Sequence, residues 1–190
     1  MISRQNLVLL NALGLLGISL VLLLAFVDQL LFQDLPCPLC LLQRAAFVLA
    51  GFGLAMNLRY GPSGRYYALT LVSALVGMAI AGRQVLLHVV PGSGSYGDPL
   101  LGLHLYTWAF LLFAAIVLGV ALLLFLHRAC DERCAETVDD LSDLARGVIW
   151  LAELVFWLFA ALTLLNGAST LLECGLGLCP DNPVDYQWLR

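Results

Sequence analysis

Cys37 and Cys40 are the residues of this sequence whose types and spacing most clearly indicate chemistry. A C-x-x-C pair can close a small ring by thiol–disulfide exchange. A thiolate near a helix N-terminus is stabilised by the helix dipole and by free backbone N–H groups. Pro38 suits a first helical turn, because its missing N–H would have no partner there. The motif therefore predicts a redox-active pair at the start of a helix, and the alternative is a disulfide that only staples the chain.

Arg44 lies four residues after Cys40, so both side chains project from one face of the predicted helix. Long side chains on a helix lean toward its N-terminus, which would bring the guanidinium toward the Cys40 sulfur. There it would favour the thiolate and offer N–H donors to the carbonyl of a ligand. The alternative is that Arg44 only extends to the lipid interface, with its charge in water.

The elements that must position these residues follow from the composition of the chain. Of its 190 residues, 62% are hydrophobic and 12% are charged, and the mean hydropathy is +0.94. Soluble domains carry about twice as many charged residues, so this composition excludes a cytosolic enzyme, a disordered chain and a disulfide-rich secreted mini-protein. The net charge of −4 offers no basic surface for nucleic acid. The chain is therefore predicted to lie in a membrane.

Five apolar stretches are long enough to cross a bilayer, which takes about 20 helical residues. Helices satisfy their backbone hydrogen bonds inside lipid, so we predict an all-α integral membrane protein that forms one helical bundle. The first stretch is longer than the apolar core of a signal peptide and precedes no cleavage motif, so it is predicted to be a membrane helix. The five stretches are residues 7–27, 41–58, 67–90, 103–126 and 148–165.

The arginines predict the orientation of this bundle, because short cytoplasmic loops are enriched in basic residues. All nine basic residues are Arg, and with five helices six of them share one face. That face is predicted to be cytoplasmic, with the N-terminus inside and the C-terminus outside. Cys37 and Cys40 then lie on the outer face, together with a second pair in the C-terminal tail, Cys174 and Cys179. The six arginines are Arg4, Arg59, Arg65, Arg128, Arg133 and Arg146.

A third cysteine pair, Cys130 and Cys134, is predicted on the inner face, in an acidic connector over residues 127–147. With His127 these two thiols have a spacing that could hold a metal on a helix. The better interpretation is that these two cysteines are free thiols in the reducing cytosol, so no metal site is assigned.

The segment Cys37-Pro38-Leu39-Cys40 with Gln43-Arg44, after a first membrane helix, resembles the disulfide bond formation protein B (DsbB) family. The resemblance covers about residues 7–126 and implies a four-helix membrane oxidoreductase, so residues 1–126 are expected to form a DsbB-like membrane domain. Such proteins reoxidise a periplasmic thioredoxin-fold (DsbA-like) partner and pass two electrons to a membrane quinone, ubiquinone or menaquinone. Further matches are Arg83-Gln84, His88, Leu101-Gly102-Leu103 and Trp108.

Site roles follow from this resemblance, residue by residue. Cys40 would be the sulfur that faces the quinone, and Cys37 would be its partner. Arg44 would hydrogen-bond or polarise a quinone oxygen, with His88 and Arg83 completing the pocket. Independently, ionisable residues inside an apolar span cost about 2.5–3.5 kcal/mol on insertion scales and usually mark a site. The alternative for Arg83 and His88 is that they are anchors at the level of the lipid headgroups.

The chain departs from this family in its second cysteine pair. Family members usually carry a second redox pair in the outer loop between the third and fourth helices, but residues 91–99 contain no Cys. Instead there is a fifth helix, predicted over residues 148–167, and an outer tail over residues 168–190. We hypothesise that Cys174 and Cys179 replace the missing pair as a relay on a Gly-rich, flexible tail. The alternative is a small structural disulfide.

The predicted function is that of a thiol:quinone oxidoreductase of the bacterial inner membrane that supports disulfide bond formation. A different class of function would keep the same fold, namely a non-enzymatic membrane subunit or assembly partner whose cysteines are structural. A membrane metal transporter is a third and weaker interpretation, because the spans contain few carboxylates.

Overall fold

The structure is a computed structural model that describes residues 4–32, 35–89, 100–134, 146–175, 177, 179 and 186–189. Five long helices account for most of these residues, and each is long and apolar enough to cross a membrane. No strand occurs within these ranges, so the predicted all-α membrane fold is confirmed. The helices are α1 (Arg4–Phe32), α2 (Pro38–Tyr60), α3 (Gly64–Leu87), α4 (Leu105–Cys134) and α5 (Arg146–Cys174), followed by a 3-10 turn, η2 (Gln187–Leu189).

The helix α5 is longer than predicted, because it continues to Cys174 and not to residue 167. The outer tail therefore starts later than expected. Its last turns carry Asn166, Ser169 and Glu173, which are polar but buried against the bundle. These polar residues lower the hydropathy of the last turns of α5, so the sequence placed the end of the helix too early. They are tolerated because they face protein and not lipid.

The connector is shorter than predicted at both ends. Residues 127–134 continue α4, and α5 begins at Arg146. The rest of the connector, residues 135–145, lies outside the described residues. The side chains of His127, Cys130 and Cys134 lie outside them as well.

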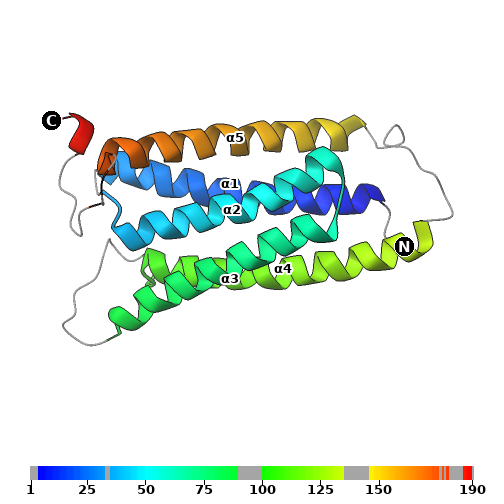
Figure 1. Ribbon diagram of the computed structural model, residues 1–190, viewed down its shortest axis with the longest axis horizontal. Coiled ribbons are helices and arrows are strands. Elements are labelled where there is room, and N and C mark those ends of the chain that lie inside the picture. Colours follow the sequence, from blue (N-terminus) through cyan, green and yellow to red (C-terminus); the bar gives the residue numbers. More distant parts are fainter. Residues whose placement is uncertain are drawn as a thin grey trace.

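The helices run lengthwise beside one another (Figure 1). Along the chain, α1 packs against α2, α2 against α3, and α3 against α4, while α5 packs on α1 and also touches α2. At one end of the bundle α2 and α4 begin and α1, α3 and α5 end (left in Figure 1). We call it the cysteine end, because Cys37, Cys40 and Cys174 lie there.

Small residues allow the helices to approach closely, as is common in membrane bundles. A Cβ added at Gly53 of α2 would collide with the Thr70 hydroxyl and the Tyr66 carbonyl of α3. A Cβ added at Gly77 of α3 would collide with the ring of Phe113 in α4.

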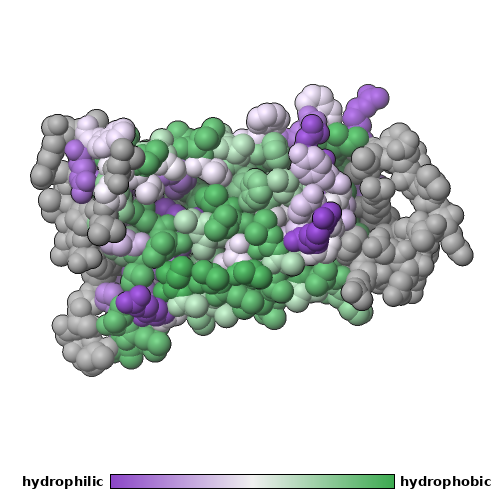
Figure 2. All heavy atoms as spheres, in the orientation of Figure 1, coloured by the Kyte–Doolittle hydropathy of each residue, from purple (hydrophilic) through white to green (hydrophobic). Residues whose placement is uncertain are grey.

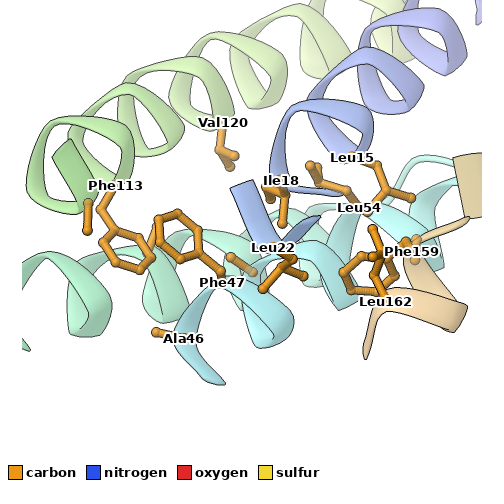
Figure 3. Close-up of a cluster of buried hydrophobic side chains, with 14 of the residues drawn as sticks. Leu15, Ile18, Leu22, Ala46, Phe47, Leu54, Phe113, Val120, Phe159 and Leu162 are labelled. Carbon is orange, nitrogen blue, oxygen red and sulfur yellow. The ribbon is translucent and has the colours of Figure 1, made fainter. Parts of the chain in front are cut away.

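The packed interior is continuous through the bundle. The Phe113 ring stacks on Phe47 of α2, with centroids 3.9 Å apart and planes 14° apart. Together with Leu22 of α1 and Phe159 of α5, these rings belong to one buried cluster to which all five helices contribute (Figure 3). The helix α5 is therefore part of the same core and not a separate appendage.

The surface has the pattern of a protein surrounded by lipid. Apolar side chains cover the middle of the visible face (Figure 2), and many leucines are exposed along the helices. Arg59, Arg65 and Arg146 are exposed at the end of the bundle opposite the cysteine end. We call that end the arginine end. The two cysteine pairs and these three arginines thus lie at opposite ends of the membrane-spanning helices.

Candidate functional site

The first predicted pair is a disulfide at the start of α2. Cys37 and Cys40 are bonded, and their Cα atoms are 5.1 Å apart. Cys37 is the N-cap residue of α2, Pro38 lies in the first turn, and the Cys40 amide donates a hydrogen bond to the Cys37 sulfur at 3.2 Å. Cys37 is only 5% exposed, whereas Cys40 is half-buried. The structure thus places the pair at a helix N-terminus, as expected, and Cys40 is the more accessible of the two.

A pair of buried glutamines that were not predicted as site residues contacts this disulfide. The Gln84 side-chain amide on α3 donates to the Cys37 sulfur at 3.6 Å and to the Cys40 sulfur at 3.7 Å. Gln43 on α2 donates to the side-chain oxygen of Gln84 at 2.7 Å. The disulfide is therefore surrounded by N–H donors from two helices.

Arg44 points toward α1 and not toward the sulfurs. Its guanidinium donates to the Gln29 side-chain oxygen at 2.6 Å and to the Ala25 carbonyl at 2.8 Å. Among the described residues it donates to no sulfur, so the expected approach to Cys40 is not found. The physical reason is that α1 offers two oxygens at the same height, and a buried guanidinium requires acceptors.

The Arg44 contact belongs to a polar cluster between α1, α2 and α5. Gln29 also donates to the Ser169 hydroxyl at 2.9 Å and to the Tyr186 hydroxyl at 3.1 Å. Glu173 is fully buried and lies within electrostatic range of Arg44, and among the described residues neither of its carboxyl oxygens has a hydrogen-bond partner. None of the residues other than Arg44 was predicted as part of the site.

The second predicted pair, Cys174 and Cys179, is also a disulfide, with Cα atoms 4.5 Å apart. Cys174 is 4% exposed and Cys179 is half-buried. The chain beyond it returns to the helix end, because a Cβ at Gly175 would lie 3.0 Å from the Trp188 indole nitrogen. With the Tyr186 contact to α1, these described tail residues are held against the bundle and are not free.

The remaining predicted residues lie on α3 and at the start of α4. The His88 ring nitrogen Nδ1 lies 2.8 Å from the Gln84 carbonyl, and its ring stacks on Tyr106 at 5.2 Å. His104 stacks on the same tyrosine at 5.3 Å, and its buried Nδ1 has no hydrogen-bond partner among the residues that the structure describes. Arg83 is exposed on α3 and is not brought to the sulfurs, because its neighbour Gln84 faces the interior. His88 is thus linked to the disulfide through Gln84.

Within the described residues, no group of three or more His, Cys, Asp or Glu could hold a metal ion. The described residues at the cysteine end include two disulfides, hydrogen-bond donors and stacked aromatic rings.

Comparisons with known proteins find related sequences over part of this chain. Residues 7–96 match the model of the family described as disulfide bond formation protein DsbB. A disulfide bond formation protein B from Chromohalobacter salexigens is 37% identical over 84 residues, which are 42% of this chain and 49% of that protein. One from Marinobacter nauticus is 47% identical over 60 residues, 30% of this chain and 36% of that protein.

A longer match is the disulfide bond formation protein B of Xanthomonas campestris, 33% identical over 114 residues, 56% of this chain and 66% of that protein. The chain thus spans about half or less of the length of the first two relatives. No solved structure matches the chain. The matched residues contain the C-x-x-C disulfide and both glutamines beside it. This chain belongs to the disulfide bond formation protein B family.

Proposed function

We propose that this protein is a membrane thiol:quinone oxidoreductase that reoxidises a periplasmic thioredoxin-fold dithiol protein and so supports disulfide bond formation. The observation that carries the proposal is the Cys37–Cys40 disulfide in the first turn of a membrane-spanning helix, within reach of N–H donors from Cys40 and Gln84. Family membership supports the same reaction.

The orientation belongs to the proposal. The exposed arginines at the arginine end favour the cytoplasmic side for that end, so the cysteine end would face the periplasm across the bacterial inner membrane. The periplasm is oxidising, which allows both disulfides to persist there.

The first half of the reaction is a disulfide exchange with the partner protein. A thiolate of the partner attacks one sulfur of the Cys37–Cys40 bond, and the other sulfur leaves with the electron pair as a thiolate. The second partner thiolate then attacks the mixed disulfide. The partner ends as a disulfide, and Cys37 and Cys40 end as a reduced pair with two more electrons.

The second half requires an electron acceptor, and the residues near the disulfide fit a quinone. His88, Tyr106 and His104 form stacked rings that suit a planar ligand, and the unpartnered His104 Nδ1 suits a carbonyl oxygen. Arg44 donates two N–H groups to acceptors on α1, so about three of its five donors are left for a ligand. Ubiquinone or menaquinone, when bound, would accept two electrons and two protons as the disulfide reforms.

In a relay form of the first half-reaction, the second disulfide is proposed to meet the partner first, and the reduced tail cysteines then take the place of the partner thiols at Cys37–Cys40. Cys179 is the accessible member and Cys174 the buried one, an arrangement that suits attack on Cys179 with Cys174 as leaving group. A relay further requires that the tail, which Tyr186 and Trp188 hold against the bundle, releases so that a thiolate reaches Cys37. A structural disulfide in this tail is the alternative outcome.

The test uses the purified full-length chain in detergent, a ubiquinone or menaquinone analogue, and a reduced thioredoxin-fold protein. We expect quinone-dependent oxidation of that protein, and its loss in Cys40→Ala. The matched control is Cys130→Ser, a cysteine change on α4 toward the arginine end, which is expected to leave the rate unchanged. A retained rate in Cys40→Ala, or no quinone reduction by the unmodified chain, would overturn the proposal and favour a non-enzymatic subunit with structural disulfides.

A further inference from the structure

Gln84 presents an amide to both sulfurs of the catalytic disulfide. The contacts of 3.6 and 3.7 Å to Cys37 and Cys40 are nearly equal, so the amide lies between the sulfurs and does not favour one. Gln84 is 1% exposed. Burying an amide in an apolar bundle is costly unless its donors are used, and here they are used on sulfur, which is a weak acceptor while it is neutral.

The orientation of this amide is fixed by Gln43, which is itself buried. Gln43 donates to the Gln84 oxygen at 2.7 Å, and this leaves the Gln84 nitrogen facing the sulfurs. The reverse orientation would place an oxygen, which has only lone pairs, against the sulfur lone pairs. Gln84 can therefore accept from Gln43 and donate to the sulfurs in only one orientation of its side-chain amide.

We propose that Gln84 is a catalytic residue that donates a hydrogen bond to whichever of the two sulfurs carries negative charge during disulfide exchange, and that Gln43 is its positioning residue. The inference rests on the proposed function, because it assigns a role within that reaction. A hydrogen bond to a charged acceptor is about twice as strong as one between neutral groups. The amide consequently stabilises the thiolate more than the disulfide.

No proton moves to or from Gln84 in this role. When one S–S bond breaks and another forms, the electron pair stays on the leaving sulfur, and the amide N–H remains bonded to its nitrogen. Because both sulfurs are already within reach, the same amide serves whichever sulfur leaves without a change of rotamer. In the reverse direction the thiolate loses its charge as the disulfide reforms, and the contact weakens again.

The experiment measures the equilibrium of the Cys37–Cys40 disulfide with a glutathione redox buffer, in the full-length chain in detergent, at about pH 8, where thiolates are populated. Gln84→Met keeps the length of the side chain and removes its donor. We expect the equilibrium constant for reduction of the disulfide to fall about tenfold. For a two-electron couple this corresponds to a reduction potential about 30 mV more negative. A merely loosened structure would have the opposite sign, since a disulfide released from its packing becomes easier to reduce.

Asn57→Leu is the matched control, because Asn57 is a buried amide of α2 at the arginine end, bonded to Asn11 and to the Ser63 amide. It is expected to lower stability and leave the redox equilibrium unchanged. Gln43→Met leaves Gln84 in place but free to rotate, and is expected to shift the equilibrium about threefold in the same direction. If Gln84→Met does not fold, Gln43→Met is used as the test variant instead.

An unchanged equilibrium in both glutamine variants, or easier reduction, would overturn this inference. The measurement needs neither quinone nor partner protein, so its result is separate from that of the proposed function. Quinone-dependent turnover with an unchanged equilibrium would refute the role of Gln84 alone. A shifted equilibrium in a chain that reduces no quinone would refute the oxidoreductase proposal alone.

Discussion

Gly53→Ala tests the close approach of α2 and α3, the two helices that carry Cys40 and Gln84. The added methyl group would collide with the Thr70 hydroxyl and the Tyr66 carbonyl. Thr70 donates across the interface to the Ala50 carbonyl at 3.0 Å, so the methyl group must displace either this hydrogen bond or the backbone of α3. One side of the collision is backbone, which cannot move aside as a flexible side chain would.

The expected size of the effect follows from these contacts. Overpacking a filled interior costs about 1–3 kcal/mol, and loss of the Thr70 hydrogen bond costs about 0.5–1.5 kcal/mol more. Alanine is favoured over glycine inside a helix by about 0.5–1 kcal/mol, which offsets part of this cost. We therefore expect Gly53→Ala to lower the free energy of unfolding by about 2 kcal/mol.

Gly17→Ala is the matched control, because a Cβ at that position of α1 meets nothing within 4 Å. There only the helix preference acts, and a gain of about 0.5–1 kcal/mol is expected. Both variants are unfolded in mixed micelles with increasing denaturing detergent and followed by circular dichroism. Equal stability of the two variants would refute the close packing of α2 on α3.

Two further predictions concern α5 and its tail. If Cys174 is part of a relay, Cys174→Ser should lower the oxidation rate of a protein dithiol at least tenfold while oxidation of dithiothreitol continues; full activity with the protein substrate would end the relay hypothesis. Arg44→Met should destabilise the bundle by about 1–3 kcal/mol, because the Gln29 side-chain oxygen and the Ala25 carbonyl lose their donor. Because Arg44 also acts electrostatically on the buried Glu173, adding Glu173→Gln should recover about 0.5–1 kcal/mol of that loss, and strictly additive effects in a double-mutant cycle would contradict the coupling.

The helices, and the end at which each cysteine pair lies, were predictable from the sequence. A membrane span needs a long apolar stretch, and the five stretches identified became α1 to α5. An odd number of helices places Cys37 and Cys174 at one end and Arg59 and Arg146 at the other, and the structure has this arrangement. The prediction worked because length and alternation of direction are properties of the chain alone.

The direction in which each side chain points could not be predicted in the same way. In a helix that is apolar on all sides, periodicity does not tell which face meets protein. That rotation is set by close contacts such as those of Gly53 and Gly77, which are visible only once the neighbours are known. Arg44 was therefore expected beside Cys40, whereas it faces Gln29.

From the sequence, Gln84 was noted only as one of the residues that resemble the family, and its contact with the disulfide was not predicted. The signal was present nonetheless, since a polar amide within an apolar span is costly and usually has a partner. Gln29, Gln43 and Glu173 carry the same signal. Intramembrane amides and carboxylates near the cysteines would have identified most of the cluster, though not which residues pair.

The position of Arg44 changes how the fifth helix is understood. From the sequence, α5 is an addition to a four-helix bundle whose value lies in the cysteines at its end. In the structure, the arginine that follows the C-x-x-C motif is held by Gln29, and Gln29 also holds Ser169 of α5 and Tyr186 of the tail. Phe159 of α5 is packed into the same core as Phe47 of α2.

The polar contacts among α1, α2 and α5 exist only while these helices remain in place. Removal of α5 would therefore leave Arg44 without Glu173 and Gln29 without two of its partners. Because Arg44 and Cys40 share one turn of α2, such a loss would disturb the first disulfide as well as the second. The helix that carries the additional cysteine pair is thus also a structural support of the C-x-x-C centre.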